Sequence, residues 1–118
     1  MKLAFLYGGQ GSQVAGMGKD LYESLPYVKA YYDGLTLGSQ PGDALYDLQK
    51  LSFEADLDTL SKTKHTQPVM VAFSGAVTTA LKEAGIVPEA VCGSSIGEYA
   101  ALAAAGALTW EQAVQIAA

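Results

Sequence analysis

Hydrophobic and polar residues follow a pattern along the chain that predicts strands alternating with helices. The short apolar runs at residues 2–7 and 90–93 do not alternate with polar residues, as is typical of strands buried in a parallel sheet. Between them, residues 67–84 carry apolar side chains at i, i+3, i+4 and i+7 spacing, which predicts an amphipathic helix. A strand, a long helix and a second strand followed by further helix predict an α/β fold with a parallel sheet.

The ends of the helix at 67–84 carry local signals. Thr66 is expected as its N-cap, and Pro68 is expected in the first turn, where the missing N–H of proline costs nothing. Gly85 follows the last apolar position and is expected at the C′ position that ends the helix. This segment is the clearest helix of the sequence.

Four shorter helices are also predicted, and a glycine-rich loop is expected over 34–42. The helices are residues 20–32, divided by Pro26; 43–50, capped by Asp43; 96–106, rich in alanine; and a last helix that starts at Trp110 after a Thr109 cap. Residues 112–118 contain no stop signal, so we expect the sequence to end inside a helix.

Composition narrows the classes of function. Of 118 residues, 50% are hydrophobic and 16% are charged, which predicts a packed core. Seven basic and twelve acidic residues give a net charge of −5 without a basic cluster, which argues against nucleic-acid binding. The longest uncharged apolar stretch, residues 99–110, is too short to span a bilayer, so we expect no membrane partner and a cytoplasmic location.

Cysteine and histidine are each represented once, by Cys92 and His65. A single cysteine can form no disulfide within the chain and no cysteine-based metal site. One histidine likewise excludes a histidine-rich metal site. We therefore expect no metal site of either kind. We also expect no permanently bound cofactor.

The candidate chemistry lies in Gly93-Ser94-Ser95-Ile96-Gly97, which matches the pattern G-x-S-x-G between a predicted strand and a predicted helix. The turn that joins such a strand to its helix is sharp, and the two elements pass so closely that Gly93 and Gly97 have no room for side chains. Ser95 is then exposed at the N-terminus of the helix, where the dipole and free N–H groups favour negative charge. The N–H of Ile96 is expected as one donor of an oxyanion hole.

Other interpretations of these residues stay open. Ser94 is a competing nucleophile one residue earlier, and the pattern itself can arise by chance in loops rich in glycine and serine. The loop at residues 8–13 follows the first strand and is a candidate source of the second oxyanion donor. It is also interpretable as an ordinary turn between strand and helix or as a phosphate-binding loop.

A nucleophilic serine needs a base, and the sequence offers few candidates. His65 has the charged neighbour Lys64 and is predicted as a surface loop residue, so we expect the base outside this chain. Glu98 is expected to interact with the helix dipole, since its side chain should project away from the Ser95 hydroxyl. Cys92 is predicted as a buried strand residue rather than a nucleophile.

Three segments in order resemble the malonyl-CoA:acyl carrier protein transacylase family. Residues 5–13 read F-L-Y-G-G-Q-G-S-Q and resemble the family's opening F-x-F-P-G-Q-G-S-Q. The T-Q-P at residues 66–68 resembles the start of the family's long helix, and G-S-S-I-G-E-Y at 93–99 resembles its G-H-S-x-G-E-Y. Together the three motifs span almost the whole chain and are far more specific than any one of them.

The resemblance implies a reaction and a division of roles. Ser95 would attack malonyl-CoA and form a malonyl-serine, from which the phosphopantetheine thiol of acyl carrier protein takes the malonyl group in fatty acid biosynthesis. The N–H groups of Gln10 and Ile96 would form the oxyanion hole. Residues 1–118 would be the incomplete N-terminal portion of the large, α/β-hydrolase-like subdomain. The family's catalytic histidine, its carboxylate-binding arginine and its ferredoxin-like small subdomain would lie beyond this chain, so residues 1–118 alone are expected to be inactive.

The sequence departs from the family motifs at two positions. Ser94 stands where the family has histidine, and Gly8 stands where it has proline, which loosens the loop expected to hold Gln10.

Two other functions remain as alternatives to this hypothesis. One alternative is the acyltransferase domain of a polyketide synthase, which the direct start of the strand after Met1 disfavours. The other is a truncated, non-catalytic protein that binds a partner, which the missing base and arginine support.

Overall fold

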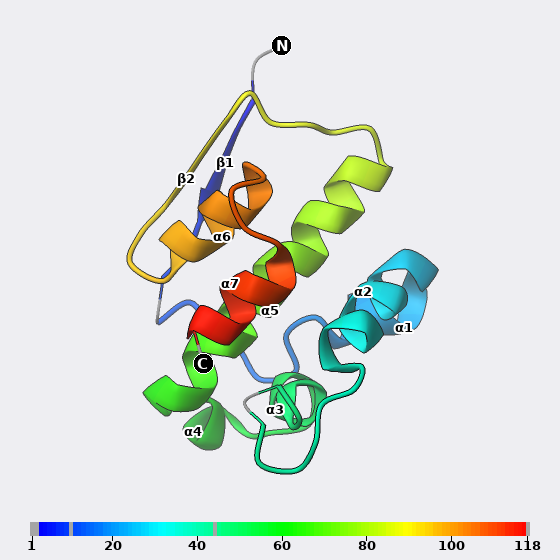
Figure 1. The fold of residues 1–118 in the computed structure, drawn as a ribbon, viewed down its shortest axis with the longest axis vertical. Helices are drawn as coiled ribbons and strands as arrows, with labels where there is room; N and C mark the ends of the chain where they lie inside the picture. The colour runs from blue at the N-terminus through cyan, green and yellow to red at the C-terminus, as the bar shows by residue number, and fades with distance from the viewer. Residues whose placement is uncertain (1–2, 10, 44, 118) are drawn as a thin grey trace.

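The computed structural model describes residues 3–9, 11–43 and 45–117. Figure 1 shows the short strands beside a group of helices, with a long helix running through the molecule. In chain order the elements are β1 (Ala4–Tyr7), α1 (Lys19–Ser24), α2 (Pro26–Thr36), α3 (Leu48–Phe53), α4 (Leu57–Leu60), α5 (Thr63–Glu83), β2 (Ala90–Gly93), α6 (Gly97–Ala104) and α7 (Trp110–Ala117).

The two strands pair in parallel, with Ala4 beside Ala90 and Tyr7 beside Gly93. The chain between them forms helices, as a parallel pair requires. The expected α/β class and parallel sheet are therefore confirmed. The expected burial of both strands is wrong, because Leu6 is 75% exposed and its neighbour Cys92 is also exposed. α6 packs on both strands, but no described element covers the face that carries Leu6 and Cys92.

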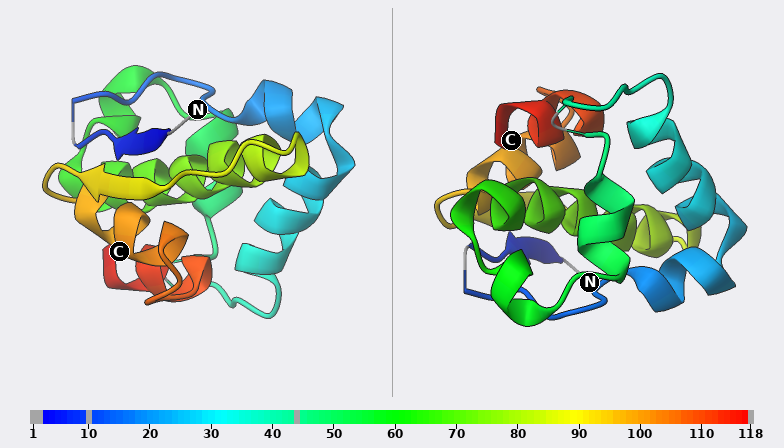
Figure 2. Two further views of the ribbon diagram at one scale, coloured as in Figure 1. Left: turned by 90° about the horizontal axis from the view of Figure 1, so that it is seen from above. Right: turned by 90° about the horizontal axis from the view of Figure 1, so that it is seen from below.

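The core is organised around α5, which contacts α2, α6 and α7. Figure 2 shows α5 crossing the middle of the molecule, with α6 and α7 on one side and the pair α1–α2 near one end. The apolar spacing expected for this helix is confirmed, since Val69, Ala72 and Ala76 are fully buried. They pack in one cluster with Tyr32 of α2 and Val114 of α7. This cluster fixes the helices that support the strands.

The start of α5 differs from the expectation. The helix begins at Thr63, because the carbonyl of Lys62 accepts the N–H groups of His65 and Thr66, each at 2.9 Å. Thr66 is therefore not an N-cap. It is buried inside the helix, and its hydroxyl donates to the carbonyls of Leu60 and Lys62. Pro68 likewise lies within the helix rather than in its first turn.

The end of α5 is as expected. Gly85 has φ +82°, a left-handed conformation that glycine adopts without steric cost. The N–H of Ile86 reaches back to the carbonyl of Leu81 at 2.9 Å, which satisfies a carbonyl that the helix leaves free. Gly85 is thus confirmed as the residue that ends the helix.

The shorter helices match the sequence signals in part. Pro26 divides α1 from α2 as expected, although α2 continues to Thr36, into the predicted loop. The helix expected at 43–50 begins only at Leu48, because the Asp43 carboxylate instead accepts the N–H of Gln40 at 2.8 Å and stabilises a turn. The cap at Thr109 is confirmed: its hydroxyl accepts the N–H of Gln112 at 3.1 Å.

The sequence signals did not predict α4. Its N-cap is Asp56, whose carboxylate accepts the N–H of Thr59 at 2.8 Å. This hydrogen bond lowers the pKa of Asp56 below its ordinary value. The one sequence signal for α4 is its capping residue, Asp56, because a helix of four residues is too short to show a hydrophobic period.

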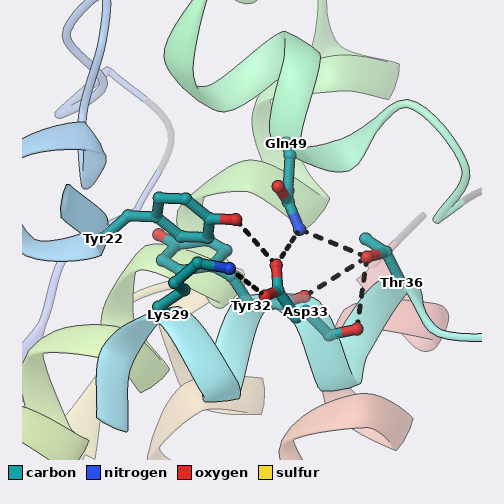
Figure 3. Close-up of polar contacts among 6 residues, drawn as sticks. All are labelled: Tyr22, Lys29, Tyr32, Asp33, Thr36 and Gln49. Carbon is teal, nitrogen blue, oxygen red and sulfur yellow. Dashed lines mark hydrogen bonds and ion pairs between the residues drawn. The ribbon is translucent and has the colours of Figure 1, made fainter. Parts of the chain in front are cut away.

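A polar network on the surface joins α1, α2 and α3 (Figure 3). The carboxylate of Asp33 accepts hydrogen bonds from Lys29 at 2.7 Å, Tyr22 at 2.8 Å and Gln49 at 3.0 Å. The bond from Lys29, followed by that from Tyr22, lowers the pKa of Asp33. The resulting stability is present above the ordinary pKa of an aspartate and is lost as the pH falls through the lowered value. Because the pair with Lys29 is exposed, this contribution is small.

We expect opposite effects on stability from alanine at two helical glycines. At Gly34 of α2, nothing lies within 4 Å of an added Cβ, so Gly34→Ala should stabilise the protein by about 0.5–1 kcal/mol. At Gly75 of α5, an added Cβ would overlap the Tyr31 hydroxyl and lie 2.9 Å from Cδ2 of Trp110. Gly75→Ala should therefore destabilise it by about 1–3 kcal/mol. Urea unfolding of the two variants measures the difference, and equal midpoints would contradict the packing of α2 and α7 on α5.

Candidate active site

The backbone turns sharply between β2 and α6, and Ser95 lies at the turn. Among the described residues, Ser95 is the one non-glycine residue with positive φ, at +55°. The carbonyl of Ser94 accepts the N–H of Gly97 at 2.9 Å, and the carbonyl of Ser95 accepts the N–H of Glu98 at 3.0 Å. A residue other than glycine is strained in this left-handed conformation. Such strained residues occur mainly at functional sites. Ser95 is exposed at the start of α6.

Close contacts on both sides of the turn explain the two glycines of the motif. A Cβ added to Gly93 would overlap the carbonyl of Gly97. A Cβ added to Gly97 would overlap the carbonyl of Tyr7 at the end of β1. Both clashes are with backbone atoms that no side-chain rotation can move. The strand and helix can pass this closely only when positions 93 and 97 carry no side chain.

The backbone N–H of Ile96, the residue after Ser95, is a candidate hydrogen-bond donor to an anion at the serine. Among the residues that the structure describes, it donates to no backbone or side-chain acceptor. The next three N–H groups, of Gly97, Glu98 and Tyr99, already donate to carbonyls within the turn. A substrate carbonyl oxygen beside Ser95 would therefore find a backbone donor that pairs with none of the described acceptors, at the positive end of the helix dipole.

The loop that follows β1 passes beside this turn. A Cβ added to Gly9 would lie 2.9 Å from the carbonyl oxygen of Ser94 and 3.8 Å from Cβ of Ser95. Further along the loop, the N–H of Gly11 donates to the side-chain oxygen of Gln13 at 2.7 Å. Gln10, expected as the second oxyanion donor, lies outside the described residues. The described part of the loop nevertheless brings its backbone into contact with the Ser94–Ser95 peptide.

Two of the other titratable candidates, His65 and Cys92, lie in surroundings that differ from the expectations. His65 is in the first turns of α5 rather than in a loop; it is partly buried, and its Nδ1 lies 3.0 Å from the carbonyl of Thr59. No hydrogen bond between described residues joins His65 to Ser95. Cys92 is on a strand, as expected, but it is exposed rather than buried. Glu98 is exposed in the first turn of α6.

A cavity of about 350 Å³ lies between β1 and α5, close to the turn but without Ser95 in its wall. Tyr7, Ser12, Phe73 and Thr78 are among its lining residues. No local pattern in the sequence marks Thr78, which hydrogen-bonds to Tyr7 across 71 positions of the chain. Ser95 itself is exposed and does not line this cavity.

A strained serine between a parallel strand and a helix N-terminus is the arrangement of acyl-transferring enzymes with a nucleophile elbow. The sequence model of the acyl transferase domain family matches residues 4–118, and the chain belongs to that family. The malonyl CoA-acyl carrier protein transacylase of Bacillus subtilis strain 168 is 45% identical over 115 residues, which cover 96% of this chain and 34% of that protein.

Solved structures show the same fold. The malonyl CoA-acyl carrier protein transacylase of Clostridium perfringens superimposes with a TM-score of 0.87 at 35% identity, covering 99% of this chain and 35% of that one. A malonyl-transacylase solved in complex with a type II polyketide synthase acyl-carrier protein gives 0.84 at 34% identity, covering 99% and 37%.

The chain thus spans about a third of the length of these relatives. Within the described residues, none of the helices combines the length and the apolar character that crossing a membrane requires.

Proposed function

We propose that this chain supplies the nucleophile of a malonyl transferase that moves malonyl groups from malonyl-CoA to acyl carrier protein. The observation that carries the proposal is the backbone of Ser95, whose φ of +55° presents the residue at the start of α6 beside the N–H of Ile96. Membership of the acyl transferase family and the names of the relatives support malonyl-CoA and acyl carrier protein as donor and acceptor. No permanently bound cofactor takes part in this proposal.

In the first half-reaction, Oγ of Ser95 attacks the thioester carbonyl carbon while its proton passes to a base outside this chain. The carbonyl oxygen becomes an oxyanion, which the N–H of Ile96 and, by resemblance, that of Gln10 stabilise. The C–S bond then breaks, the coenzyme A thiol leaves with a proton, and a malonyl ester remains on Ser95. In the second half-reaction, the phosphopantetheine thiol of the carrier attacks this ester and releases the serine hydroxyl.

Fatty acid biosynthesis is the proposed pathway, on the strength of the resemblance to the free-standing transacylases. A polyketide pathway is the second candidate. It is supported by the fold-related transacylase that was solved with a type II polyketide synthase acyl-carrier protein. The two differ in the carrier that accepts the malonyl group, and not in the chemistry at Ser95.

The direct test uses the intact gene product, radiolabelled malonyl-CoA and acyl carrier protein. We expect label on carrier that bears phosphopantetheine and none on apo carrier, because only the former has the acceptor thiol. Comparing carriers from fatty acid and polyketide systems distinguishes the two pathways. An intact protein that labels neither carrier would favour the non-catalytic, partner-binding function instead.

We expect residues 1–118 alone to have no transferase turnover. The described hydrogen bonds do not join His65 to Ser95, and the chain contains few other groups that could act as a base near neutral pH. The purified 118-residue chain and the intact gene product are compared at equal concentration with malonyl-CoA and carrier. Turnover by the shorter chain would show that the base lies within these residues.

A further inference from the structure

The backbone of Tyr7 contacts the Ser95 turn on both sides of the serine. Its carbonyl oxygen accepts the N–H of Ser94 at 3.3 Å, which extends the ladder between β1 and β2 by one bond. The same carbonyl lies so close to Gly97 that a Cβ there would overlap it. A shift of this carbonyl would therefore displace Ser94 and Gly97, which lie on either side of Ser95.

The side chain of Tyr7 is fixed by a hydrogen bond whose direction can be assigned. Its hydroxyl lies 2.7 Å from Oγ1 of Thr78, a buried residue of α5. The Thr78 hydroxyl has one proton, and it donates that proton to the carbonyl of Ser74 at 2.8 Å. Tyr7 must then be the donor in the bond to Thr78. Burial raises the pKa of the Tyr7 phenol, so the donor keeps its proton at neutral pH.

A second contact holds the Tyr7 ring from another helix. The ring of Trp110, the first residue of α7, meets it edge to face, with centroids 6.3 Å apart and planes at 61°. α5 and α7 pack against each other, and both helices contribute residues to the hydrophobic core. Tyr7 thus links the end of β1 to two core helices.

The chain that leaves Tyr7 has little stiffness of its own. Gly8 and Gly9 follow, and Gly9 lies against the carbonyl of Ser94. Glycine gives the backbone wide conformational freedom, so the course of this loop past Ser95 depends on how firmly its first residue is held. We propose that the Tyr7–Thr78 hydrogen bond positions the Ser95 turn and the adjoining loop for transfer, which makes Tyr7 and Thr78 positioning residues; this inference rests on the proposed function.

The test compares variants of the intact gene product in malonyl transfer. Tyr7→Phe and Thr78→Val each delete one partner of the bond with little change in shape. Misplaced oxyanion donors weaken binding of the transition state more than of the substrate, so we expect kcat to fall about tenfold with the KM for malonyl-CoA changed less than about twofold. Because the two residues act as one unit, the double variant should be no slower than the slower single variant.

Two control variants separate positioning from a general loss of stability. Thr78→Ser keeps the hydroxyl and should retain most of the wild-type kcat. Tyr32→Phe removes the hydroxyl of another buried tyrosine, which has no hydrogen-bond partner among the described residues, and should leave kcat unchanged. Thermal unfolding of every variant shows whether kcat and stability change together.

The outcomes distinguish this inference from the proposed function. If the wild-type protein transfers malonyl and Tyr7→Phe and Thr78→Val keep its full kcat, the positioning role is wrong while the function stands. Losses of kcat that add up in the double variant would also overturn positioning through this bond. So would single variants whose melting temperature falls while kcat stays unchanged. A wild-type protein that transfers no malonyl would overturn the proposed function and this inference with it.

Discussion

Ser95→Ala should abolish malonyl transfer by the intact gene product, with a loss of at least about 10³-fold, since a nucleophile that forms the covalent intermediate has no substitute. Alanine keeps the Cβ of serine and loses only the hydroxyl, so the turn at φ +55° should persist and the fold should be unchanged. Mass spectrometry of the protein after brief exposure to malonyl-CoA should find the malonyl group on the peptide with Ser95 in the wild type and no such adduct in the variant.

Ser94→Ala is the matched control, because it removes a neighbouring exposed hydroxyl from the same turn. Its backbone N–H still donates to Tyr7, and its carbonyl still accepts from Gly97, so the geometry of the turn does not depend on its side chain. We expect labelling and transfer to remain. Fragmentation that assigns the malonyl group to Ser94 would overturn the role given to Ser95.

Gly93→Ala should destabilise the protein by about 3 kcal/mol and also stop transfer, because the added Cβ would overlap the carbonyl of Gly97 and lie 2.7 Å from the N of Glu98. Relief of that clash requires β2 and α6 to move apart, which displaces Ser95 and the N–H of Ile96. Urea unfolding gives the change in stability, and the malonyl transfer assay gives the change in activity.

The matched control for this variant is Gly34→Ala, which adds the same methyl group at a helical position open to solvent. It should keep full transfer activity. A Gly93→Ala protein as stable and as active as Gly34→Ala would show that the strand and helix do not pass as closely as the structure indicates.

The sequence predicted the elements whose signals are local. Pro26 removes a donor and divides two helices, Gly85 adopts the left-handed conformation that ends a helix, and Thr109 caps α7 through its own hydroxyl. Each of these effects depends on residues within a few positions of one another. The same reasoning misplaced the starts of α5 and α3. The Thr66 hydroxyl donates to the carbonyls of Leu60 and Lys62 instead of capping α5, and the Asp43 carboxylate accepts the N–H of Gln40 instead of starting a helix.

The sequence by itself determined the alternation of strands with helices and the position of a serine between two glycines at a junction of strand and helix, because these follow from local hydrophobic patterns and short-range sterics. It also predicted the parallel strand pair, because strands that are joined through helices pair in parallel. Only the tertiary structure decided that Leu6 and Cys92 are exposed and that Gly9 lies beside Ser94. It also decided that the Tyr7 hydroxyl reaches Thr78, 71 positions away. Contacts between distant segments depend on how the helices pack around α5, and no local pattern encodes that packing.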